Sequence, residues 1–128
     1  MNYGVIDVGS NTVRLCVYDV LCSEKRKFKT IMNRKIMAGL AAYIVDGAFS
    51  DEGIAEAILA VKKCLKRASY LSPDRVDVFA TAVLRNVSNS AQAIASIEQG
   101  AGCTISLLSN SDEAHLGFVG ASSRGALD

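Results

Sequence analysis

The chain has 128 residues, enough for one domain with its own hydrophobic core and too few for two ordinary domains. Half of the residues are hydrophobic, one is proline and the net charge is +1, which excludes a disordered chain and gives no overall field that would favour a nucleic acid or a membrane as partner. No run approaches the length of a membrane span, and the first residues lack the basic and apolar regions of a signal peptide.

The first part of the chain predicts three consecutive strands. Residues 3–8 and 12–20 are short runs rich in apolar and β-branched side chains, and the Gly-Ser-Asn sequence between them predicts a tight turn that makes them a hairpin. Residues 28–38 predict a third strand. A loose, glycine-containing loop is expected to follow through Gly47.

A long amphipathic helix is predicted after this loop. Ser50 is suited to cap its N-terminus, and two acidic residues in the first turn complement the helix dipole. The helix is expected to end near Tyr70, before the single proline. Its apolar residues recur at helical spacing, at Ile54, Ile58, Val61 and Leu65, and Ala57, Cys64 and Ala68 widen this stripe.

The last part of the chain predicts a further alternation of strands and helices. Residues 76–81 and 103–108 are short buried-strand candidates. Between them, a helix is expected to be capped at residues 89–90 and stopped by the Gly-Ala-Gly sequence at residues 100–102. A final helix is expected to begin at Asp112.

The order of these elements is βββαβαβα, which predicts an α/β fold with a mixed five-stranded sheet and helices on its faces. Antiparallel strands followed by strands that alternate with helices are typical of the ribonuclease-H-like half domain. Two such lobes form the core of actin-like ATPases and sugar kinases. We expect residues 1–128 to form a single lobe of this kind.

The hairpin turn is the first candidate site. Glycine allows a backbone to approach an anion, and the consecutive N–H groups of such a turn can cradle phosphate oxygens. Asp7, at the end of the preceding strand, could bind Mg²⁺ directly or through water. No GxxxxGK[ST] loop is present, and a merely polar hairpin turn is the structural alternative. The turn residues are Gly9, Ser10, Asn11 and Thr12.

The second candidate is an arginine that follows a buried strand. Arg85 comes just after the run at residues 76–81, and ligands of α/β sheets bind beyond the carboxyl ends of the strands. A guanidinium can pair two phosphate oxygens at once. Asn89 follows shortly after Arg85. The structural alternative is an ordinary surface arginine.

The third candidate is the carboxylate pair Asp112-Glu113, which opens the last predicted helix directly after a strand. One carboxylate could act as a general base that orients an attacking water. The structural alternative is that both acids complement the helix dipole. We assign no catalytic or binding role to His115.

Taken together, the three motifs resemble those of the exopolyphosphatase and guanosine-pentaphosphate phosphohydrolase family, over essentially the whole chain. The family's Ile-Asp-x-Gly-Ser-Asn-Ser/Thr turn matches residues 6–12, and its Ala-Thr-x-x-Leu-Arg segment matches residues 80–85, with Asn89 nearby. Its Ser-Gly-x-Glu-Glu-Ala-Arg segment matches residues 109–115, where this chain has Asn in place of Gly, Asp in place of the first Glu and His in place of Arg.

The resemblance implies release of terminal phosphate from inorganic polyphosphate or from guanosine pentaphosphate, by attack of a base-activated water. The family's catalytic glutamate falls on Glu113 and its phosphate-binding arginine on Arg85. The first phosphate loop falls on residues 9–12, with Asn89 as a further phosphate-binding residue. Mg²⁺ or a similar divalent cation is the implied cofactor, with Asp7 as one ligand.

The family also has a second lobe, opened by an Asp-x-Gly-Gly-Gly-Ser loop that supplies metal and phosphate contacts. This sequence ends at about the point where that lobe would start. We therefore expect residues 1–128 to be a single N-terminal lobe that is inactive alone. The apolar surface that would meet a second lobe favours a homodimer.

Two other classes of protein remain open. One is a binding or sensing module for polyphosphate or guanosine tetraphosphate that has lost turnover, and the other is a nucleotide-binding lobe of the actin or sugar-kinase type. Six of the 14 Lys and Arg lie between residues 25 and 35, which predicts either a charged strand edge or a surface for a polyanion. The four cysteines form no CxxC or metal-type pair, so we expect reduced thiols and a cytoplasmic location.

Overall fold

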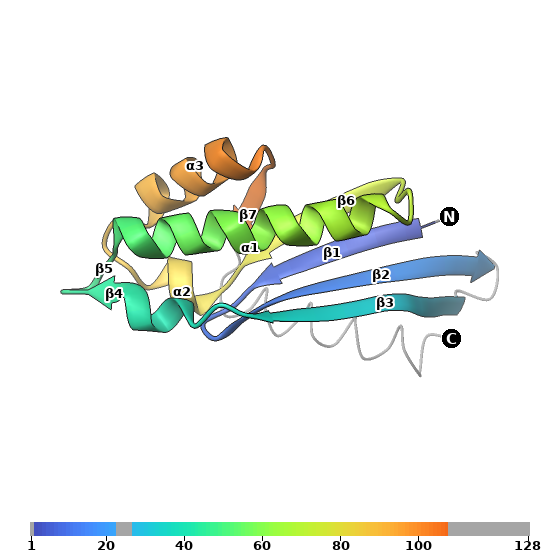
Figure 1. The fold of residues 1–128 in the computed structure, drawn as a ribbon, viewed down its shortest axis with the longest axis horizontal. Helices are drawn as coiled ribbons and strands as arrows, with labels where there is room; N and C mark the ends of the chain where they lie inside the picture. The colour runs from blue at the N-terminus through green and yellow to red at the C-terminus, as the bar shows by residue number, and fades with distance from the viewer. Residues whose placement is uncertain (1, 23–26, 108–128) are drawn as a thin grey trace.

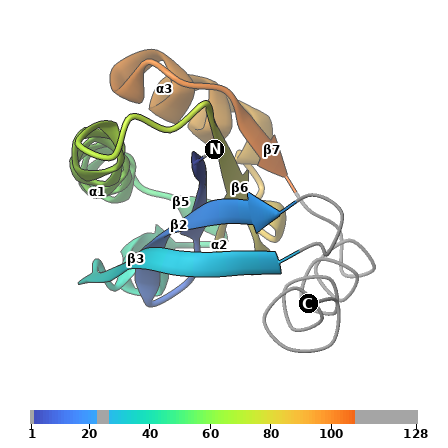
Figure 2. The same ribbon diagram turned by 90° about the vertical axis from the view of Figure 1, so that its right-hand side faces the viewer.

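The computed structural model describes residues 2–22 and 27–107. A five-stranded sheet runs through it in the strand order β3-β2-β1-β6-β7, and α1 and α3 lie on one side of this sheet (Figures 1 and 2). The strands of the sheet are β1 (Asn2–Val8), β2 (Thr12–Cys22), β3 (Lys27–Met37), β6 (Arg75–Ala80) and β7 (Ile105–Leu107).

The sheet is mixed, as the sequence predicts. β1, β2 and β3 form an antiparallel meander, whereas β6 pairs parallel to β1 and β7 pairs parallel to β6. Each parallel step needs a crossover connection, and helices supply both of them. The predicted α/β fold with a five-stranded, ribonuclease-H-like sheet is therefore confirmed.

Side chains alternate between the two faces of the central strands. On β1 and β2, Ile6, Val8, Val13 and Leu15 are fully buried on the face that α1 covers. The residues between them point to the opposite face, where Asp7 is exposed. The core therefore lies between the sheet and the two long helices.

α1 (Asp51–Ser69) begins where the sequence predicts. The Ser50 hydroxyl accepts a hydrogen bond from the Gly53 N–H at 3.2 Å, which satisfies one of the free donors of the first turn. Val61 and the three small residues of the predicted stripe are buried, whereas Ile54, Ile58 and Leu65 are partly buried and pack against the core. The fully buried residues of its centre are Ala57, Ala60, Val61, Cys64 and Ala68.

The segment between β3 and α1 is more regular than the predicted loop. It contains a 3₁₀ turn, η1 (Leu40–Tyr43), and a small hairpin of β4 (Ile44–Val45) and β5 (Ala48–Phe49). Asp46 and Gly47 form the hairpin turn, both with positive φ, at 52° and 79°. This is the Asp-Gly signature of a two-residue hairpin, a signal that the prediction overlooked.

The second crossover contains a short helix, α2 (Ala82–Arg85), and the longer α3 (Ser90–Ala101). α3 ends at Gly102, which has the left-handed conformation of a helix C-cap (φ 73°). Asn89 precedes α3 as predicted, but its side chain makes no capping hydrogen bond. The predicted helix at Asp112 lies outside the described residues. Within the described ranges, no helix is both long and apolar enough to cross a membrane.

Candidate functional site

The Gly9–Thr12 turn closes the β1–β2 hairpin at one end of the sheet. The Gly9 N–H donates to the Thr12 carbonyl oxygen at 2.9 Å. Residues after β3 hold the turn from the side, since the N–H of Gly39 donates to the Asn11 carbonyl at 2.9 Å and that of Ala41 to the Ser10 carbonyl at 2.8 Å. Two carbonyl oxygens that would repel an anion are thereby directed at the η1 segment.

Arg85 lies beyond the same end of the sheet. β6 runs parallel to β1, with Val8 beside Ala80, and the next residue, Thr81, donates both its N–H (3.2 Å) and its hydroxyl (3.3 Å) to the Val8 carbonyl. The Arg85 N–H in turn donates to the Thr81 carbonyl at 3.0 Å. Arg85 is thus one helical turn past the strand, as the last residue of α2, rather than directly at the strand end.

Asn89 is engaged with a backbone segment of the hairpin. Its Oδ1 accepts from the Phe49 N–H at 2.8 Å, and its Nδ2 donates to the Phe49 carbonyl at 3.0 Å. The neighbouring Ser88 N–H donates to the Gly47 carbonyl at 2.8 Å. Contact between Asn89 and phosphate stays a prediction, and the structure places its amide against Phe49.

Asp7 lies two residues before Gly9 on β1, with an exposed side chain on the face that α1 does not cover. Its neighbours across the sheet are Arg14 on β2 and Phe79 on β6. Among the described residues, no group of three His, Cys, Asp or Glu side chains could hold a metal ion. Mg²⁺ commonly keeps several waters and takes one or two carboxylates together with substrate phosphates, so Asp7 fits the role of a single ligand.

Glu113, the predicted catalytic base, lies outside the described residues, as do Asp112 and His115. The structure therefore brings two of the three motifs to one end of the sheet and leaves the place of the third untested. Thr81 and the η1 segment support the first two motifs, and sequence reasoning assigned them no role.

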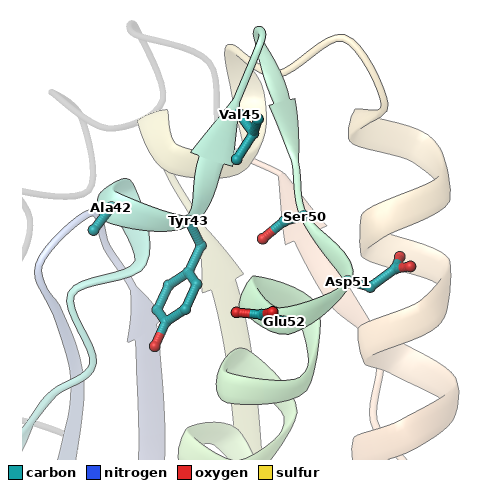
Figure 3. Close-up of a pocket in the computed structure, with 6 residues that line it drawn as sticks. All are labelled: Ala42, Tyr43, Val45, Ser50, Asp51 and Glu52. Atoms are coloured by element: carbon teal, nitrogen blue, oxygen red, sulfur yellow. The ribbon is translucent and has the colours of Figure 1, made fainter.

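A pocket of about 410 Å³ opens beside this end of the sheet, between η1, the hairpin and the start of α1. Figure 3 shows the Tyr43 ring and the Glu52 carboxylate on the same side of it, whereas Asp51 points away from Tyr43. The lining has two acidic residues and no basic one, so it would repel a phosphate. None of the predicted site residues lines it; the lining residues are Ala42, Tyr43, Val45, Ser50, Asp51 and Glu52.

The largest pKa changes occur away from the turn. Burial and a hydrogen bond to Asp77 raise the pKa of Tyr3 to about 12, and Tyr3 lies at the other end of β1. Burial raises the pKa of the Cys64 thiol to about 11, which leaves it protonated and unreactive in the core. The candidate site is thus defined by backbone geometry and an arginine, not by a perturbed acid or base among the described residues.

Comparison with known proteins places these features in a family. The model of the Ppx/GppA phosphatase family matches residues 20–126. A solved Ppx/GppA family member from Aquifex aeolicus shares the fold at a TM-score of 0.85 and 21% identity, over 96% of this chain and 40% of that one. An exopolyphosphatase from Cytophaga hutchinsonii has a TM-score of 0.80 and 26% identity, over 91% of this chain and 36% of that one.

The similarity covers only part of each solved structure. The chain spans between 36% and 40% of the length of these two structures, and its five-stranded sheet and crossover helices correspond to one part of each. The family model covers the strand before the Arg85 segment, that segment and the region of Glu113. On this ground, the chain belongs to the Ppx/GppA phosphatase family.

Proposed function

We propose that this chain is part of a phosphohydrolase that releases the terminal phosphate of inorganic polyphosphate or guanosine pentaphosphate. The observation that carries the proposal is the meeting of two motifs at one end of the sheet. The Gly9–Thr12 turn follows β1, Arg85 follows β6, and the two hydrogen bonds from Thr81 to Val8 join these segments. The solved exopolyphosphatase that shares this fold supports the substrate class.

Each group has a defined task in this proposal. The turn supplies backbone N–H groups to phosphate oxygens, and Arg85 pairs two of those oxygens with its planar guanidinium. Phosphoryl transfer depends on positioning and on neutralisation of charge. Glu113 would take the proton of the attacking water, which makes the water a better nucleophile toward the terminal phosphorus.

A divalent cation fits the same end of the sheet. Asp7 is an exposed carboxylate two residues from the turn, and Mg²⁺ would bind there together with substrate oxygens and water. Such an ion, when bound, neutralises phosphate charge. Asp7 would hold it beside the turn, and the family's second lobe, which is not part of this sequence, would supply further ligands.

A polyphosphate-binding module without turnover is the second candidate. It is favoured by the chemistry of the described residues, in which no group of three His, Cys, Asp or Glu side chains could hold a metal ion. Among residues 2–22 and 27–107, the groups proposed to meet a phosphate are one loop and one arginine. Charge neutralisation from several sides, on which turnover depends, would need further groups.

The two candidates can be separated with purified protein of residues 1–128. Phosphate release from long-chain polyphosphate and from guanosine pentaphosphate is measured with Mg²⁺, and binding of tripolyphosphate is measured by calorimetry. We expect binding without release for the lobe alone, a result that both candidates allow, whereas release would exclude the module. Release that Glu113→Gln abolishes would show a complete catalytic site in these residues. Neither binding nor release would overturn both proposals.

A further inference from the structure

Asn89 connects the segment of Arg85 to the β4–β5 hairpin. Its side-chain amide pairs with the Phe49 backbone in the manner of a neighbouring strand, donating to the carbonyl and accepting from the N–H. The Ser88 N–H adds a third bond, to the Gly47 carbonyl. The four residues from Arg85 to Ser88 are therefore held at both ends, by Thr81 on one side and by the hairpin on the other.

Phe49 is a fixed point for this connection. Its ring is 2% exposed and packs against the first turn of α1, where a Cβ on Gly53 would lie 2.6 Å from the ring and 2.6 Å from the Cβ of Tyr43. Only a glycine at position 53 allows this approach without movement of its neighbours. The adjacent Ser50 N–H also donates to the Tyr43 carbonyl at 3.0 Å, so the backbone at Phe49 is held from both sides.

The β4–β5 hairpin is connected to the Gly9–Thr12 turn through η1. η1 ends directly before β4, and the Gly39 and Ala41 N–H groups at its start bind the carbonyls of the turn. The turn, η1, the hairpin, Asn89, α2 and Thr81 thus form a closed ring of hydrogen-bonded segments. The Asn89 amide makes two hydrogen bonds between the hairpin and the Arg85 segment, and the Ser88 N–H makes another.

We propose that Asn89 is a positioning residue, which holds Arg85 at a set place relative to the Gly9–Thr12 turn and acts on phosphate only through Arg85. This inference rests on the proposed function. It follows from the hydrogen bonds: Oδ1 and one Nδ2 hydrogen of Asn89 are engaged with the Phe49 backbone, and a phosphate that took either place would leave a part-buried backbone group without its partner. The second Nδ2 hydrogen is outside this pair, and the mutant cycle below measures whether it contributes.

A double-mutant cycle separates positioning from direct contact. Tripolyphosphate affinity is measured by calorimetry for wild type, Asn89→Ala, Arg85→Ala and the double variant. A positioning residue loses its effect once Arg85 is gone: we expect Asn89→Ala to weaken binding about tenfold alone and less than about twofold in the Arg85→Ala background. Losses that multiply would show direct contact and overturn the inference. Asn86→Ala, an exposed asparagine of the same loop, is the matched control and should bind like wild type.

Amide hydrogen exchange, followed by NMR without ligand, tests the ring itself. Asn89→Ala should speed exchange at the Phe49 and Arg85 amides by about tenfold or more and leave Ile6 unchanged, because local opening is governed by local bonds. Unchanged exchange at Phe49 and Arg85 would overturn the inference. If wild type fails to bind tripolyphosphate while these amides respond as expected, the proposed function fails and the connection that positions Arg85 stands.

A second variant tests the inference if Asn89→Ala fails to fold. Asn89→Ser supplies a hydroxyl suited to cap α3, yet it is too short to reach both backbone groups of Phe49. It should fold and show the same coupling to Arg85 as Asn89→Ala. Full tripolyphosphate affinity in folded Asn89→Ser would count against the positioning role.

Discussion

The two ends of the central sheet differ in how their polar groups are satisfied. At the end where β1 begins, side chains satisfy one another: the Tyr3 hydroxyl donates to Asp77, whose other oxygen accepts from Arg75 at 3.0 Å. Asn2 adds bonds to the chain after α1, at Leu71 and Asp74.

At the end where β1 finishes, the backbone bonds hold segments in place. The turn is fixed through its carbonyl oxygens, and Arg85 through its own N–H. The raised pKa of Tyr3 therefore marks the end of the sheet where polar side chains already bind one another. The end that we propose binds phosphate is instead distinguished by the turn carbonyls, which are already hydrogen-bonded, and by Arg85.

The largest effect should come from the predicted base. In a form of the protein that turns over polyphosphate, Glu113→Gln keeps the size of the side chain and removes its basicity, so turnover should fall by roughly 10²–10⁴-fold. Phosphate release is the measurement, and Asp112→Asn is the matched control, with little expected change. Turnover near that of wild type would show that Glu113 only complements a helix dipole.

Two arginines test the comparison between the ends directly. Arg85→Ala should weaken tripolyphosphate binding by about 10- to 100-fold, since it removes charge-assisted hydrogen bonds, and the difference from wild type should shrink in high salt. Arg75→Ala removes the same charge at the opposite end and should leave affinity within about twofold. Equal losses for both variants would mean that binding follows net charge and not a site.

Tyr3→Phe should alter stability without altering the phosphate end. It leaves Asp77 without the hydroxyl donor, and we expect a loss of about 1–2 kcal/mol in the free energy of unfolding, measured by urea denaturation. Tripolyphosphate affinity should not change. Tyr70→Phe is the control, because Tyr70 is 71% exposed. A variant as stable as wild type would show that the Tyr3–Asp77 bond contributes nothing net.

The same tyrosine predicts a small pH effect. Its pKa is raised from 10.0 to about 12 in the folded protein, so the folded state holds this proton more tightly than the unfolded state. The stability that this provides is complete below pH 10 and is lost as pH rises toward 12. Wild type and Tyr3→Phe should therefore converge in stability between pH 10 and 12, and a constant gap across that range would contradict the assignment.

Most of the sheet could be predicted because its signals are local. Each signal is contained in a few neighbouring residues. This holds for the turn between β1 and β2, for the Ser50 cap and for the apolar runs of β1, β2 and β6. The β4–β5 hairpin was missed although Asp46-Gly47 is a strong turn signal, because its two strands have two residues each and show no alternation.

The candidate site was less predictable, because its supports join residues far apart in the chain. Arg85 was predicted as a site residue directly beyond the strand, but it is the last residue of α2, and a helix of four residues leaves no periodic pattern in the sequence. The bond pair between Asn89 and Phe49 spans 40 residues. No spacing rule indicates such a pair, since it depends on where the hairpin and α3 settle against α1.

The small residues beneath α1 have a consequence for how this fold can vary. Ala57, Ala60 and Ala68 are buried, and one residue, Ser50, separates α1 from the end of β5 at Phe49. A valine at Ala57 would lift the N-terminal half of the helix, because a packed core has no room for two more methyl groups. That displacement would carry Phe49 with it. We therefore expect a change of core volume beneath α1 to alter the placement of Arg85, so that a substitution far from the proposed phosphate contacts weakens binding.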